Sequence, residues 1–80
     1  MSRRRVQFTY DSSQIKDPVI YELGRQFDVV TNIRRADVVE DRGWVILEIE
    51  GQEIDIDRGL AWVESRGVRV DPVLWDVVEG

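Results

Sequence analysis

The segment Val29-Val30-Thr31-Asn32-Ile33 constrains the fold of this chain more than any other feature, because it divides the 80 residues into two similar halves. It follows directly on an apolar helical pattern and leads into a long hairpin. Each half then reads as a strand, a helix and a strand. The order strand, helix, strand, strand, helix, strand predicts two helices packed on a single antiparallel sheet.

The first half predicts one strand and one helix. Val6, Phe8 and Tyr10 alternate with polar residues, which indicates a strand with one apolar face. Asp17-Pro18 starts the helix, because Asp caps free amide groups and Pro is tolerated at the first helical position. Gly24 inside the helix predicts a close contact with the sheet or with a partner. The apolar face of the helix consists of Val19, Ile20, Leu23 and Phe27, with Ile15 over the helix start.

The centre of the chain predicts a β-hairpin. Its first strand runs from Val29 to Glu40, but Asn32, Arg34 and Arg35 interrupt the alternation. A bulge near Arg34 would restore the pattern. The inner face would then hold Ile33, Ala36 and Val38. Asp41-Arg42-Gly43 supplies the turn, and the strand Trp44–Glu50 returns with Val45, Leu47 and Ile49 inside.

The second helix is predicted from about Gln52 to Arg66, with a buried stripe of Ile56, Leu60 and Val63. Gly59 beside this stripe would let the helix lie close to the sheet. Gly67 fits a left-handed C-terminal cap. Val68 and Val70 form the last strand, and Pro72 suits the edge of a sheet.

These elements together predict an α+β fold, a ferredoxin-like βαββαβ sandwich with a four-stranded antiparallel sheet and two helices on one face. We expect one domain over residues 1–80, with a core over about 5–74, a terminal arm over 1–4 and a tail over 75–80. The basic cluster Arg3-Arg4-Arg5 is interpreted as a solvated terminus. A fold of this kind does not by itself indicate a function.

Composition excludes several kinds of chemistry. The sequence has no Cys and no His, which removes thiolate ligands, disulfides, the commonest general base and the commonest transition-metal ligand. The net charge of -5 argues against binding to nucleic acid or to an anionic membrane. No segment approaches the roughly 20 apolar residues of a membrane span. We therefore expect a soluble cytoplasmic protein with no cofactor, no metal and no catalytic activity.

Several motifs resemble those of the NIL domain, a family named for an Asn-Ile-Leu motif. They are Asp17-Pro18-Val19-Ile20, Leu23, Phe27, Val29-Val30-Thr31-Asn32-Ile33, Gly59-Leu60-Ala61-Trp62-Val63 and Gly67-Val68-Arg69-Val70. The resemblance covers about Val6 to Val73. This domain occurs at the C-terminus of the ATPase subunit of bacterial methionine importers, in some ferredoxin-type proteins and as a free-standing protein.

The resemblance implies a ferredoxin-like domain that forms a homodimer and binds methionine near the dimer interface, where it restrains transport. Asn32 and Ile33 match the named motif, while Arg34 stands where the family usually has Leu and Ala36 stands where Gly is common. Ligand-binding residues are therefore expected at Asn32, Ile33 and Arg34. The sequence contains no phosphate-binding Gly-x4-Gly-Lys-Ser/Thr motif, so it resembles the sensor of an importer without the ATPase.

Other interpretations of the same residues stay open. Asn32 can be an ordinary turn or bulge residue, and Arg34 and Arg35 can be solvated charges. Trp44, Trp62 and Trp75 read first as packing residues, with Trp75 as a candidate interface residue. The pair Asp55 and Asp57 is better explained by a helix N-terminus than by calcium binding.

Four functions compete at this level. The first is a homodimeric sensor of methionine or a related amino acid, with a transporter or another protein as its partner. The second is a protein-interaction module without a small ligand, which would add an edge strand to a larger protein. RNA binding would require exposed aromatic residues in a basic field. Acyl phosphate hydrolysis would require an Arg in the loop after the first strand, and residues 11–17 contain none.

Overall fold

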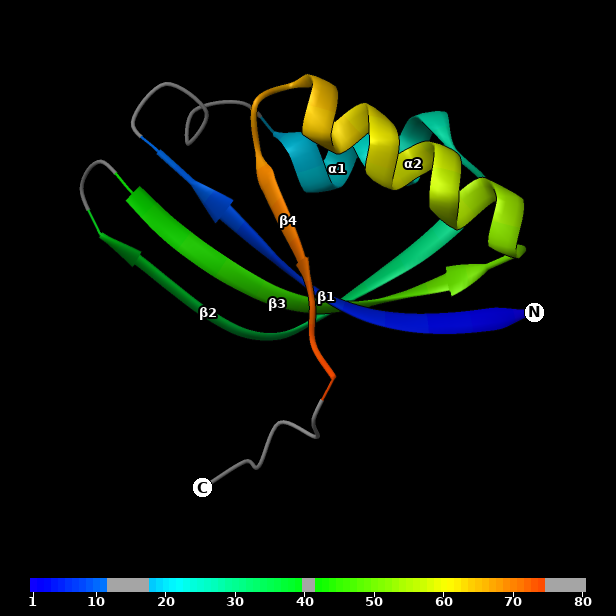
Figure 1. Cartoon of the computed structure of the whole chain (residues 1–80), viewed down its shortest axis with the longest axis horizontal. Coiled ribbons are helices and arrows are strands. Elements are labelled where there is room, and N and C mark those ends of the chain that lie inside the picture. The colour runs from blue at the N-terminus through cyan, green and yellow to red at the C-terminus, as the bar shows by residue number, and fades with distance from the viewer. Residues whose placement is uncertain (12–17, 40–41, 75–80) are drawn as a thin grey trace.

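A computed structural model describes residues 1–11, 18–39 and 42–74 of the chain. Within these residues the elements are, in order, β1 (Ser2–Tyr10), α1 (Val19–Gln26), β2 (Val29–Val39), β3 (Arg42–Gly51), α2 (Glu53–Ser65) and β4 (Arg69–Pro72). The four strands form one sheet in the order β2-β3-β1-β4, and neighbouring strands are antiparallel. Both helices cover the same face of the sheet (Figure 1). The predicted ferredoxin-like α+β fold is confirmed.

The core lies between the sheet and the helices, and it uses the residues that the sequence periodicity selected. Alternate side chains of β1 and β3 point toward the helices and are buried, as are the apolar stripes of α1 and α2. The residues that these four elements contribute to the core are Val6, Phe8, Tyr10, Val19, Leu23, Val45, Leu47, Ile49, Ile56, Leu60 and Val63. Ile20, Phe27, Trp62 and Val70 pack around them.

The terminal arm expected over residues 1–4 is instead part of β1, which begins at Ser2 opposite Gly51. The arginine cluster extends the strand because each arginine meets a carboxylate of another element. Arg3 and Arg5 pair with acidic residues of β3 across the sheet. Arg4 points to the helical side and donates a hydrogen bond of 2.8 Å to Asp57 of α2. The cluster is therefore part of a paired strand and not a free arm, while the Arg3 side chain is still 65% exposed.

The bulge predicted near Arg34 is confirmed, because the register of β2 against β3 shifts between Ile33 and Arg35. Ile33, Ala36 and Val38 pair with β3 residues on the helical face, as predicted, but all three are exposed. Ile33 is 54% exposed and Val38 is 59% exposed. Their burial was predicted wrongly, because β2 is an edge strand and its side chains are less covered than those of the central strands.

The hairpin turn also differs from the prediction. Arg42 and Gly43 belong to β3, where they pair with Val39 and Val38. Asp41, the remaining residue of the predicted turn, lies outside the described residues, as do Ile15, Asp17 and Trp75.

Two of the predicted glycine roles change in the structure. A Cβ at Gly59 would lie 2.7 Å from Cδ1 of Leu23, so this glycine lets α2 approach α1 rather than the sheet. Gly24 is exposed, and the nearest atom to a Cβ there would be the carbonyl oxygen of Val29 at 4.0 Å, so the predicted close contact with the sheet is absent. Gly67 has φ 89° and ends α2 in the predicted left-handed conformation.

The last strand begins one residue later than predicted and lies at the edge of the sheet beside β1. Pro72 pairs with Val6, and the amide of Val73 donates to the carbonyl oxygen of Arg5 at 3.0 Å. An edge position suits Pro because it has no amide to donate. None of the helices in the described residues has the length and apolar character needed to cross a membrane.

Candidate functional site

The predicted ligand residues Asn32, Ile33 and Arg34 lie at the bulge of β2, which is an edge strand of the sheet. Asn32 stands opposite Glu48 of β3, and Ile33 stands opposite Leu47. Arg34 is the extra residue of the bulge. Because successive residues of a strand point to opposite faces, Asn32 is on the open face of the sheet and Ile33 is on the helical face.

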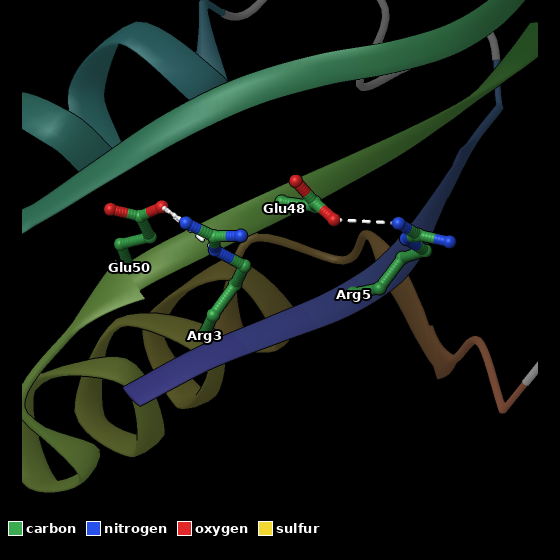
Figure 2. Close-up of polar contacts among 4 residues, drawn as sticks. All are labelled: Arg3, Arg5, Glu48 and Glu50. Carbon is green, nitrogen blue, oxygen red and sulfur yellow. Dashed lines mark hydrogen bonds and ion pairs between the residues drawn. The ribbon is translucent and has the colours of Figure 1, made fainter. Parts of the chain in front are cut away.

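On the open face, side chains from three neighbouring strands form a charged row. Glu48 of β3 lies between Asn32 of β2 and Arg5 of β1 in the paired register. Arg5 donates a hydrogen bond of 2.6 Å to the Glu48 carboxylate, and both side chains are partly buried. One step along the same strands, Arg3 donates a hydrogen bond of 2.8 Å to Glu50 (Figure 2).

The electrostatics of this row depend on Glu48. The hydrogen bond from Arg5 holds the pKa of the Glu48 carboxyl below its usual value of 4.5, and the positive charges of Arg5, Arg34 and Arg3 lower it further. Glu48 is therefore a carboxylate at neutral pH. The contribution of Arg34 shows that its charge acts on the same carboxylate that Asn32 faces.

The open face thus combines groups that suit a zwitterion. The Asn32 amide can both donate and accept hydrogen bonds, Glu48 accepts them, and Arg34 carries a positive charge. Val30, two residues before Asn32 on the same face, is 67% exposed and offers an apolar surface. Asn32, Ile33 and Arg34 are themselves exposed, so in one chain this site is an open surface at the sheet edge.

Several cavities between described residues lie away from Asn32, Ile33 and Arg34. One of about 320 Å³ lies between α1 and α2. A second of about 250 Å³ is at the free end of the hairpin, beside Trp44. A third of about 240 Å³ is on the helical face between α1 and Val38, and Tyr10 is part of its lining. Burial raises the pKa of the Tyr10 phenol to about 12, which keeps it neutral in this position.

The remaining candidate residues have structural contacts. Asp57 is paired with Arg4 at 2.8 Å, and the described residues contain no cluster of acidic residues suited to a metal ion. Trp62 packs against Phe27 with their ring centroids 5.9 Å apart. Phe8 and Tyr10, which an RNA-binding sheet would expose, are buried under the helices.

A family model for the NIL domain matches residues 4–72, which is most of the chain. The chain belongs to the NIL domain family. Among solved structures, this NIL domain is similar to the C-terminal domain of an ABC transporter/ATP-binding protein from Enterococcus faecalis, with a TM-score of 0.82 and 16% identity over 91% of this chain and 86% of that one. It is also similar to the de novo designed protein Ferredog-Diesel, with a TM-score of 0.51 and 14% identity over 88% and 84% of the two chains. No curated protein matches the chain.

Sequence reasoning missed two residues of the charged row, Arg5 and Glu48. Their signal was present as two matched patterns, because basic residues at Arg3 and Arg5 and acidic residues at Glu48 and Glu50 each have the two-residue spacing of one strand face. Opposite charges at this spacing on two strands favour a pairing that sets them across from each other. An arm over residues 1–4 leaves Arg3 outside the predicted strand, and this boundary hides the pattern.

Proposed function

We propose that this NIL domain is a non-catalytic regulatory domain that acts as a homodimer in the cytoplasm and binds a small amino acid such as methionine. Its membership of the family over residues 4–72 supports this function, as does the similarity of its fold to a domain of an ABC transporter/ATP-binding protein. The proposed protein partner is a transporter subunit. The observation that carries the proposal is that the edge strand β2 exposes apolar side chains beside the charged row that contains Asn32.

The dimer contact is proposed at β2. This edge strand has 11 residues and exposes apolar side chains on both faces. The exposed apolar residues on it are Val30, Ile33, Val38 and Val39. A long apolar edge strand is a site at which another strand adds, and natural proteins normally cover or interrupt it. A second copy paired along β2 would satisfy the edge hydrogen bonds and cover apolar residues on both faces at once.

The ligand is proposed to bind where this edge meets the charged row. The ammonium group of an amino acid would face Glu48, and its carboxylate would take hydrogen bonds from Asn32 and Arg34. Val30 would contact the side chain. Because β2 lies at the proposed dimer contact, a second chain would enclose a site that is open in one chain.

Isothermal titration calorimetry with methionine tests the ligand, and sedimentation equilibrium tests the dimer. Asn32→Ala and Arg34→Gln should each weaken methionine binding, by about tenfold or more for the loss of a charge-assisted hydrogen bond. Arg58→Gln on the exposed surface of α2 is the matched control and should bind normally. Val38→Lys should shift the protein toward monomer, because it places a charge in the apolar contact.

The alternative is a protein-interaction module without a small ligand, which the same open edge of β2 supports. An edge strand of another protein would then replace the second copy. A monomer that binds none of methionine, homocysteine or cysteine at millimolar concentration would contradict the sensor and favour this module. A dimer that binds methionine with unchanged affinity after Asn32→Ala would contradict the placement of the site.

A further inference from the structure

The cavity of about 320 Å³ between α1 and α2 is a second candidate site, on the helical side of the molecule. It is lined by Pro18, Val19, Glu22, Gln26, Trp62 and Arg66. The two helices lie side by side on the sheet (Figure 1). The cavity is therefore on the opposite side of the sheet from Asn32 and Glu48, and the function proposed above does not use it.

The lining follows from helical spacing. Val19, Glu22 and Gln26 are three and seven positions apart on α1, so they share one face of that helix. Trp62 and Arg66 are four positions apart at the C-terminal end of α2. The helices are antiparallel, because the strands β1 and β3 that lead into them are antiparallel. The start of α1 therefore lies beside the end of α2.

The cavity has an aromatic wall between two opposite charges. Trp62 is held in place by Phe27, and the Arg66 guanidinium lies 6.0 Å from the centre of the Trp62 ring. On the facing helix, the Glu22 carboxylate accepts a hydrogen bond of 2.8 Å from Gln26 and lies 3.5 Å from Arg25. These contacts hold Glu22 in one orientation, with its side chain 28% exposed.

We propose that this cavity binds a small zwitterion with an apolar or aromatic side chain, of the kind that a free amino acid presents. The ammonium group would pair with Glu22, the carboxylate would pair with Arg66, and the side chain would lie against Trp62 and Val19. Ligand cavities in proteins usually measure about 300–1,000 Å³, so this one is suited to a ligand at the small end of that range. The aromatic ring adds dispersion contact and attracts cations to its face.

Tryptophan fluorescence tests the proposal, because the cavity wall is itself the probe. L-methionine, L-leucine and L-phenylalanine should each be titrated into the wild-type protein and into Trp62→Phe. At least one of them should produce a saturable change in the wild type that is absent in Trp62→Phe. The N-acetylated amide of the same amino acid lacks both charges, and it should fail to produce the change.

Charge variants test the assigned contacts. Glu22→Gln and Arg66→Gln should each lower the affinity measured by the Trp62 signal at least about tenfold, as expected for the loss of one ionic hydrogen-bond partner. Glu64→Gln and Arg58→Gln make the same chemical changes at exposed positions of α2, and they should leave this affinity unchanged. Thermal unfolding followed by circular dichroism identifies any variant whose folding is impaired. Arg66→Lys keeps the positive charge and should therefore retain part of the binding affinity.

Asn32→Ala separates this inference from the function proposed above. It should leave the Trp62 signal intact even where it reduces methionine binding at the sheet edge. The inference is overturned if none of the three amino acids changes the Trp62 signal at millimolar concentration, or if Glu22→Gln and Arg66→Gln bind with the wild-type affinity. Either result leaves the proposed site at Asn32 unaffected.

Discussion

Gly51→Ala is expected to destabilise the protein through a single steric contact. A Cβ at Gly51 would lie 2.8 Å from the carbonyl oxygen of Asp28 and 3.2 Å from Cγ1 of Val29. The oxygen belongs to the backbone that leads into β2, and Val29 is paired with Gly51 in the sheet. Neither atom is at the end of a flexible side chain. The start of β2 would therefore have to move away from β3.

The size of the effect follows from comparable changes in packed interiors. Adding a methyl group where the surroundings cannot yield costs about 1–3 kcal/mol. A domain of this length is stable by about 4–12 kcal/mol, at roughly 0.05–0.15 kcal/mol per residue. The substitution should thus remove a substantial part of the free energy of unfolding. It should lower the melting temperature by about 4–8 °C for each kcal/mol lost.

Urea unfolding followed by circular dichroism, at equal protein concentrations, measures this loss as a lower midpoint with an unchanged slope. Gly24→Ala is the matched control. Outside its own helix and its chain neighbours, the new Cβ would have no atom nearer than 4.0 Å, and Ala favours a helix over Gly, so the substitution should raise stability by about 0.5–1 kcal/mol. A Gly51→Ala protein as stable as the wild type would refute the steric argument.

Three further predictions concern packing and titration. Gly59→Ala should destabilise the helix pair in thermal unfolding, because the new methyl group meets buried Leu23 at 2.7 Å; a higher melting temperature than wild type would contradict this. The pKa of Glu48 is lowered in the folded state, so its stabilising contribution is present above pH 4.5 and is lost as the pH falls below that value. Urea midpoints measured against pH should therefore fall less steeply on the acid side in Glu48→Gln than in the wild type, and equal slopes would argue against the Arg5 contact. Burial raises the pKa of Tyr10 from 10.0 to about 12, so stability should fall as the pH rises through this interval. Tyr10→Phe should remove this part of the loss of stability at alkaline pH, and it should also remove the tyrosinate absorbance step near pH 12. An absorbance step that persists in Tyr10→Phe would show that Tyr10 is not its source.

The sequence predicted those features of the fold that depend on neighbours along the chain. Alternation selected Val6, Phe8 and Tyr10 as a buried strand face, and helical spacing selected Ile56, Leu60 and Val63. The interrupted pattern in β2 was sufficient to place the bulge at Arg34, because a two-residue period cannot otherwise continue past it.

The candidate site was less predictable from the sequence. Asn32, Ile33 and Arg34 came from a family resemblance, and their role in ligand binding stays a prediction. The residues that surround them in the folded protein could not be predicted from the sequence. Glu48 becomes a neighbour of Asn32 only through the register of β2 against β3, which brings together residues far apart in the chain.

The amino-acid sequence by itself determined the order of the elements and the faces that they bury, because periodicity is a local property of strands and helices. Only the tertiary structure decided that Arg3 and Arg4 belong to β1, that Gly59 lies where the two helices meet and that Ile33 and Val38 stay exposed. Each of these outcomes depends on which distant segment lies opposite, or on which strand lies at the edge of the sheet. Both are set when the whole chain packs, and no short window of sequence contains them.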